Sequence, residues 1–347
     1  MNFFRSSRSD AVGVLDFGAE EAVVLIGDKT AQGQLRVIGS GRFRALGVDK
    51  GQIVNIGDAV ESVAEAASRA ERSAGMMLKT LFYNLDDPNI EARRPVGSRI
   101  LDGEGEIQPL DIKQAVESAR RMAGDYDKTI LYAKETDFVV DDKDAVADPL
   151  GIFGHKINLT LETLLVRASH FDAWQKILRR AGFSKAKPVL SGLSVVRGVL
   201  TDEQQKETRV VWDLGKDLLT GVVYGNNRVR AYRVIAHDES LWDQSSSVIL
   251  AVTQGWQQEF GGILETVVAG DLAEDQKIIS ALREGTALPV RRAQATLEGM
   301  PGFTCASLAG LLKIAYEIKK KSMILRPKKD VLAGMKQKAD AFLNDYF

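Results

Sequence analysis

The sequence predicts an α/β protein built from two related lobes with a cleft between them. Its 347 residues exceed the ~100–200 typical of one domain, and 45% hydrophobic residues suffice for two cores. An apolar strand, an Asp-x-Gly turn and a second apolar strand occur at 11–27 and again at 209–224. Each copy continues into a third strand, at 35–40 and at 229–235. Two such halves are expected to bring their turns together at one cleft.

Composition excludes several classes of protein. The 46 basic and 47 acidic residues leave a formal charge of -1, so we expect no nucleic-acid partner. Cys305 is the one cysteine and the three histidines are scattered, so we expect no disulfide framework and no metal site. Residues 1–10 lack a signal-peptide core and are predicted to be a flexible tail. No apolar run reaches the ~18 residues of a spanning helix, so any membrane contact is expected to be peripheral.

Residues 11–77 and 167–206 are predicted to form the core of the first lobe. The stretch 55–74 has apolar residues at helical spacing with charged residues on the other side, which indicates an amphipathic helix on a sheet. Residues 78–166 instead alternate strands with one helix near 108–122, for which Asp111 is a candidate N-cap. This segment is predicted to be an inserted α+β subdomain.

Residues 207–318 are predicted to form the core of the second lobe. Only about 30 residues separate its third strand from the next, enough for about one helix at 240–260 and a turn. The second lobe is therefore predicted to be reduced and to lack an outer subdomain.

Several stretches resemble the FtsA branch of the actin, Hsp70 and sugar-kinase superfamily. They are Gly33-Gln-Leu-Arg-Val-Ile-Gly-Ser-Gly41, Leu46-Gly-Val-Asp-Lys-Gly-Gln-Ile-Val54, Ala70-Glu-Arg-Ser-Ala-Gly75 and Asp148-Pro-Leu-Gly151. The resemblance, from Val12 to Tyr316, implies an actin-like two-lobed duplicated fold in which 78–166 is the extra subdomain of FtsA. It also implies a role in bacterial cell division, with division proteins as partners and a membrane helix at the end of the chain.

The resemblance implies a nucleotide site in the cleft, where both Asp-x-Gly hairpins would clamp ATP. If the site is retained, its residues are Asp16, Gly18, Asp213, Gly215, Lys216 and Gly270. Glu20 and Glu21, however, follow where the family has a hydroxyl residue and a lysine, and leucines follow Lys216 where it has glycines and threonines. One interpretation is a degenerate cleft with no cofactor; the other is weak binding of ATP and magnesium. Alternatively, the two aspartates only hydrogen-bond their own turns.

The outer subdomain that we expect to be missing carries, in FtsA, the groove for the tail of FtsZ. Direct binding of the FtsZ tail is therefore not expected from this chain.

The carboxyl end is predicted to be a basic linker, 319–328, followed by an amphipathic helix, 329–347. The helix has an apolar stripe beside lysines, which is typical of a helix lying in an anionic membrane interface. A terminal helix packed on protein is the alternative. The membrane-binding candidates are Lys328, Lys329, Val331, Leu332, Met335, Lys336, Lys338, Phe342, Leu343, Tyr346 and Phe347.

The sequence thus favours a non-catalytic, actin-like adaptor or scaffold on the cytoplasmic face of the inner membrane, which self-associates as an oligomer or filament. Two alternatives stay open: an ATP-binding filament protein, and a PilM-like scaffold for pili or the envelope. A small-molecule kinase is disfavoured, because no general base is placed for phosphoryl transfer and no catalytic residue can be assigned.

Overall fold

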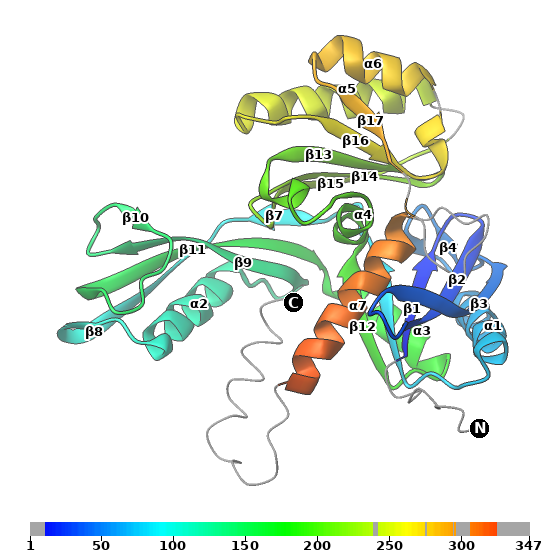
Figure 1. Cartoon of the computed structure of the whole chain (residues 1–347), viewed down its shortest axis with the longest axis horizontal. Coiled ribbons are helices and arrows are strands. Elements are labelled where there is room, and N and C mark those ends of the chain that lie inside the picture. The colour runs from blue at the N-terminus through cyan, green and yellow to red at the C-terminus, as the bar shows by residue number, and fades with distance from the viewer. Residues whose placement is uncertain (1–10, 239–241, 275, 294, 296–305, 325–347) are drawn as a thin grey trace, which may run out of the picture. The chain divides into compact units, whose positions relative to one another are not determined.

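The computed structural model describes residues 11–238, 242–274, 276–293, 295 and 306–324 (Figure 1). They divide into two compact units, one made by the chain up to Pro88 with Asp172–Glu317, the other by Asn89–Phe171 with the chain from Ile318. The predicted tail at 1–10 and the predicted helix at 329–347 lie outside the described residues.

The first unit contains two five-stranded sheets of the same topology. The first sheet has the order β12-β6-β1-β2-β3, with β1 (Val12–Phe17), β2 (Glu21–Lys29), β3 (Leu35–Arg44), β6 (Thr80–Leu85) and β12 (Lys185–Leu190). The second has the order β15-β14-β13-β16-β17, with β13 (Arg209–Leu214), β14 (Leu218–Gly225), β15 (Arg228–Ala236), β16 (Thr266–Ala269) and β17 (Val290–Arg292). Each is an antiparallel three-stranded meander joined by two parallel strands. The predicted duplicated, two-lobed fold is confirmed.

Further helices and short elements lie wholly or mostly in this unit. They are β4 (Val48–Asp49), β5 (Gln52–Ile53), α1 (Ile56–Ala74), α3 (Ala168–Arg180), α4 (Ser191–Val199), η2 (Gln204–Lys206), α5 (Trp242–Glu259), η4 (Asp271–Glu274), α6 (Gln276–Thr286) and α7 (Ala306–Ile324). Asn55 caps α1, since its side chain accepts from two amides of the first turn, and Gly75 ends the helix in the left-handed conformation.

Small residues let α1 lie directly on the first sheet. A Cβ added to Gly41 in β3 would lie 2.0 Å from the carbonyl oxygen of Ala66, and one added to Gly39 would lie 2.6 Å from that of Ala70. The alanines of α1 and the glycines of β3 therefore specify this packing together.

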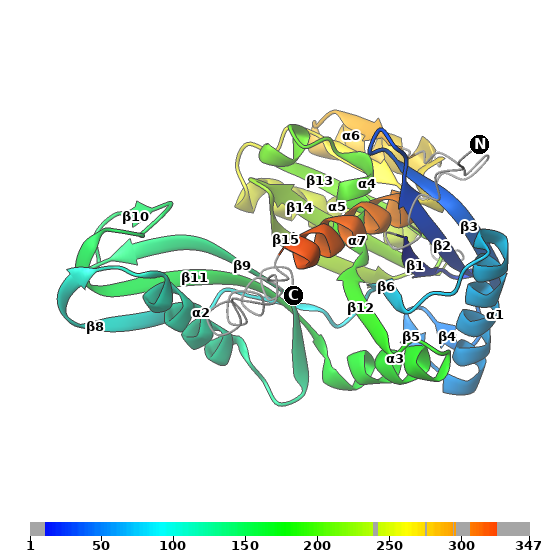
Figure 2. The same cartoon turned by 60° about the horizontal axis from the view of Figure 1, so that its bottom comes forward.

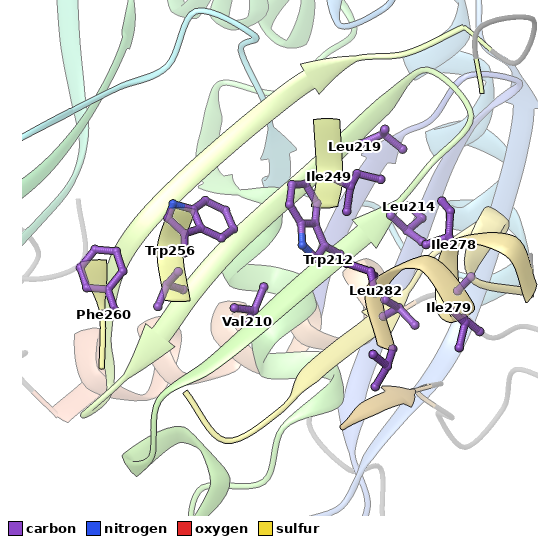
Figure 3. Close-up of a cluster of buried hydrophobic side chains, with 14 residues drawn as sticks. Val210, Trp212, Leu214, Leu219, Ile249, Trp256, Phe260, Ile278, Ile279 and Leu282 are labelled. Atoms are coloured by element: carbon purple, nitrogen blue, oxygen red, sulfur yellow. The ribbon is translucent and has the colours of Figure 1, made fainter. Parts of the chain in front are cut away.

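The core of the second lobe lies between its sheet and helices α5 and α6 (Figure 3). Trp212 in β13 is fully buried and stacks on Trp256 of α5, with ring centroids 5.6 Å apart. Its indole N–H donates to the hydroxyl of Thr253 at 3.0 Å, so the buried polar atom has a partner.

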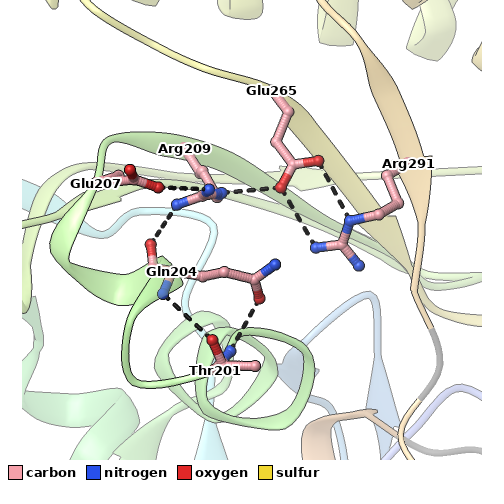
Figure 4. Close-up of polar contacts among 6 residues, drawn as sticks. All are labelled: Thr201, Gln204, Glu207, Arg209, Glu265 and Arg291. Atoms are coloured by element: carbon pink, nitrogen blue, oxygen red, sulfur yellow. Dashed lines mark hydrogen bonds and ion pairs between the residues drawn. The ribbon is translucent and has the colours of Figure 1, made fainter.

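An ion-pair network joins three strands at one end of the second sheet (Figure 4). Glu265, just before β16, accepts from Arg209 of β13 at 2.8 Å and from Arg291 of β17 at 3.2 Å. Burial alone would raise the pKa of Glu265, but the hydrogen bonds from the two arginines outweigh it and lower that pKa. The network therefore stabilises the protein at neutral pH and weakens as acid protonates Glu265.

Helices α4 and α7 cross in close contact. A Cβ added to Gly310 would lie 1.6 Å from the carbonyl oxygen of Ser194, and one added to Gly198 would lie 2.1 Å from that of Ala306. Only glycine allows the two backbones to approach this closely.

The second unit is a sheet covered on one face by a helix (Figure 2). Its elements are β7 (Glu91–Arg93), β8 (Val96–Glu106), α2 (Pro109–Ala123), β9 (Lys128–Val140), β10 (Ala145–Val146) and β11 (Phe153–Arg167). The strand order is β10-β9-β11-β7, and β8 pairs with another part of β11. Gly97 of β8 allows α2 to lie directly on the sheet, since a Cβ added to it would lie 2.1 Å from the carbonyl oxygen of Ala115.

The structure differs from the sequence prediction at three places. The inserted subdomain cannot begin at residue 78, because β6 pairs with both β1 and β12 in the middle of the first sheet. The linker cannot begin at 319, because α7 continues to Ile324. Asp111 is the third residue of α2, where its carboxylate accepts the N–H of the N-cap residue Gln108 at 3.0 Å.

No helix within the described part of the chain is long and apolar enough to cross a bilayer.

Replacing Gly310 by alanine should lower the free energy of unfolding by about 2–4 kcal/mol, because the new methyl overlaps the α4 backbone. Gly255→Ala is the matched control: this exposed glycine of α5 has open space around its Cβ, and alanine favours helix by about 1 kcal/mol. Urea denaturation of both variants checks the difference. Equal effects would contradict the close crossing of α4 and α7.

Candidate functional site

The two Asp-x-Gly turns have the same hydrogen-bond pattern. In the β1–β2 turn the N–H of Gly18 donates to the carbonyl of Glu21 at 3.0 Å, and in the β13–β14 turn the N–H of Gly215 donates to that of Leu218 at 3.1 Å. The turns therefore repeat each other residue for residue. Both glycine amides are used within their own turns.

A cavity of about 550 Å³ lies where these turns meet. All six residues predicted for nucleotide binding line it, although they come from distant parts of the sequence: Asp16, Gly18, Asp213, Gly215, Lys216 and Gly270. The structure thus brings the predicted site residues together around one cleft.

The lining of the cavity is strongly acidic. Two cations, Arg42 and Lys216, face seven carboxylic acids: Asp16, Glu20, Glu21, Asp86, Asp213, Asp217 and Asp271. Both cations are paired with the first turn, Lys216 with Glu20 at 2.6 Å and Arg42 with Glu21 at 3.0 Å. Lys216 therefore neutralises a carboxylate of the protein in this structure, and its role beside a phosphate stays a prediction.

Asp86 connects elements of both lobes at the base of the cleft. Its carboxylate accepts from the hydroxyls of Ser191 in α4, Thr220 in β14 at 3.0 Å and Tyr232 in β15 at 2.9 Å. Burial raises the pKa of Asp86, and these hydroxyl donors oppose the rise. A hydroxyl-lined carboxyl group therefore joins β6 to the second sheet.

Asp16 is held by side chains of the first lobe and of α7. It accepts from the amide of Asn84 at 3.2 Å and from the hydroxyl of Ser307. Gln175 of α3 donates to Tyr83 of β6, and Trp174 packs edge-on against Phe17 at 5.4 Å. The first turn is thus supported by side chains of β6, α3 and α7.

Asp213 has an unusual environment. Burial first, and then the charges of Asp16, Asp86 and Asp271, raise its pKa to about 8. Gly270, at φ +95, lies against this residue, because an added Cβ would be 2.6 Å from Oδ1 of Asp213. The position requires glycine both for its backbone angle and for this contact.

The carboxylates of this lining would repel the phosphates of a nucleotide. Like charges about 4 Å apart repel by about 4 kcal/mol at an effective dielectric constant near 20, and the cleft has more carboxylates than cations. The N–H groups of Gly18 and Gly215 are already bonded. In the described segments, no group of three or more His, Cys, Asp or Glu side chains is arranged to hold a metal ion directly.

Asn84, Asp86, Trp174 and Ser307 are among the cleft residues that the sequence did not predict. Asp86 had a recognisable signal, since it follows an apolar strand and precedes Asp87-Pro88 at the point where a parallel strand ends. Ser307 had none, because only the folded chain brings it to Asp16.

Residues 89–165 match the SHS2 domain inserted in FtsA. The chain is 27% identical over 221 residues to cell division protein FtsA of Pseudomonas aeruginosa, and 26% identical over 224 residues to that of Bacillus subtilis. The resemblance to FtsA is confirmed. These matches cover 64% of this chain but only 53% and 50% of the two FtsA proteins, so the chain spans about half the length of the curated relatives it matches.

Solved structures share the fold. A chain of a PilM-PilN type IV pilus biogenesis complex superposes with a TM-score of 0.59, covering 88% of this chain and 98% of its own, at 10% identity. Ethanolamine utilization protein EutJ of Carboxydothermus hydrogenoformans gives a TM-score of 0.50 at 11% identity, with 87% and 89% covered. At these identities the likeness concerns the fold alone.

Asp213→Asn should change how stability depends on pH. Because the folded-state pKa is raised above the unfolded value of 3.8, Asp213 makes the protein progressively less stable as pH rises from about 4 to 8. One pKa unit corresponds to about 1.4 kcal/mol, so the asparagine variant should gain at least about 1 kcal/mol over the parent at pH 9 relative to pH 5.

Urea titrations at pH 5, 7 and 9 measure this difference. Asp172→Asn, at an exposed position of α3, is the matched control and should follow the parent. Parallel pH profiles for Asp213→Asn and the parent would show that Asp213 does not titrate in this way.

Proposed function

We propose that this chain is a non-catalytic, actin-like adaptor of bacterial cell division that associates with itself and with the inner face of the cytoplasmic membrane. The observation that carries the proposal is the combination of an FtsA-type SHS2 domain at 89–165 with a cleft rich in carboxylates. The first supports a place among division proteins. The second supports a role that does not depend on phosphoryl transfer.

Membrane association is proposed to use the segment 329–347. Its apolar stripe would enter the lipid interface, and each lysine beside the stripe would contribute about 1 kcal/mol of attraction to anionic lipid. Division proteins other than FtsZ are the proposed partners. A pull-down that recovers pilus proteins and no division proteins would favour the PilM-like alternative.

The full chain should pellet with phosphatidylglycerol vesicles, whereas a chain ending at Leu325 should stay in the supernatant. Leu332→Asp places a charge on the apolar stripe and should reduce pelleting severalfold. Gln337→Asp adds the same charge on the opposite side of the predicted helix and is the matched control. If the truncated chain pellets as well as the full one, the proposed anchor is wrong.

Nucleotide binding is the second candidate function, because the six predicted residues do converge around one cavity. Our proposal expects no binding of magnesium ATP below about 1 mM by calorimetry. Glu20→Ser should strengthen any binding, since it removes an acid and releases Lys216. Glu104→Ser, an exposed change in β8, is the control. Micromolar, magnesium-dependent binding by the parent protein would establish the alternative instead.

A further inference from the structure

The turn between β4 and β5 reaches across the mouth of the cleft. Lys50 lies in this first-lobe turn, and its Nζ is 2.8 Å from Oδ2 of Asp238, which follows β15 in the second lobe. The backbone N–H of Lys50 also donates to the carboxylate of Asp217 in the second Asp-x-Gly turn. One residue therefore contacts two parts of the second lobe.

The next residue packs against the same turn. A Cβ added to Gly51 would lie 2.9 Å from Cδ1 of Leu218, so the leucine lies directly on this glycine. Lys50 and Gly51 both have positive φ, at 46° and 74°, and this tight local conformation presents them to the second lobe. The side chain of Leu218 is too bulky to let a phosphate approach the backbone of the turn closely. Its role is instead an apolar contact between the lobes.

A second charged pair also joins the two lobes. Nζ of Lys216 is 2.6 Å from Oε1 of Glu20, so the two Asp-x-Gly turns are joined directly. The charge of Lys216 also opposes the rise in the pKa of Asp271. The lysine thus lies among carboxylates from both lobes.

We infer that the two lobes are clasped by the chain's own side chains, in the place where an actin-like protein would use a ligand. The clasp consists of Glu20, Lys50 and Gly51 on the first lobe and Lys216, Asp217, Leu218 and Asp238 on the second. Every contact joins two groups of the protein. The closed arrangement is therefore the resting state of the chain, and opening it requires breaking these contacts.

Each charged pair is partly exposed, with side-chain exposures of 33% and 71% for Lys216 and Glu20 and of 39% and 43% for Lys50 and Asp238. Such pairs are individually weak, so neutralising one should raise the open population about twofold to fivefold. Four contacts together hold the cleft closed. They are the two charged pairs, the hydrogen bond from Lys50 to Asp217 and the packing of Leu218 on Gly51. Adding salt should open it by screening the pairs.

Hydrogen exchange of the full-length protein tests the clasp through a double-mutant cycle. Lys216→Gln alone and Glu20→Gln alone should each raise amide exchange about twofold to fivefold in two turns, 17–21 and 214–218, that belong to different lobes. The double variant should exchange no faster than either single one, because the pair is broken once. Lys50→Gln and Asp238→Asn form a second cycle, with the turns 48–52 and 214–218 as readouts.

Arg36 and Asp28, paired at 2.7 Å within the first lobe, provide the matched control cycle and should leave the turn at 214–218 unchanged. A rise confined to the turn that carries the substitution would overturn the clasp, as would fully additive effects within a pair. The hydrogen-exchange measurement requires neither lipid nor a partner protein. The clasp can thus fail while the proposed function stands, and the reverse also holds.

Discussion

The concentration of carboxyl groups at the base of the cleft is the constraint on which the rest of the first unit depends. Asp16, Asp86, Asp213 and Asp271 come from four different strands or their ends, and their charges would repel one another if left uncompensated. Their mutual repulsion is reduced in different ways. Hydroxyl and amide donors surround Asp16 and Asp86, the pKa of Asp213 is raised, and Lys216 offsets Asp271. These contacts connect both sheets with α4 and α7.

The same residues explain how an Asp-x-Gly turn, which in the resembled family contacts the phosphates of ATP, can take a structural role. The duplicated hairpins keep their geometry, since both glycine amides close identical turns. The side chains beside them differ from a phosphate cradle: Glu20 pairs with Lys216, and Leu218 packs on Gly51. The side chains that would repel a nucleotide are therefore the ones that join the lobes. The scaffold that we propose, which would not cycle through nucleotide states, has a use for such a fixed cleft.

Much of the fold could be predicted because the sequence repeats itself at the level of whole lobes. The Asp-x-Gly turns, the meanders and the reduced second lobe all follow from local patterns of apolar residues, glycine and chain length. The start of the inserted subdomain could not be predicted well, because β6 is central to the first sheet through its pairing with β1 and β12, which are distant in sequence. The residues of an apolar strand do not indicate which sheet the strand joins.

Part of the candidate site could likewise be predicted from local motifs, and part could not. The six predicted residues lie on motifs whose spacing brings them together, and they do line one cavity. Ser307, Asp86 and the pairing of Lys216 with Glu20 depend on contacts across 291, 134 and 196 residues of sequence, which no local pattern encodes. A crystal structure of the 347-residue chain with magnesium ATP at millimolar concentration tests whether the cleft takes up nucleotide. We expect an intact Lys216–Glu20 pair and no nucleotide density; ordered phosphates between the two turns would contradict the proposed function.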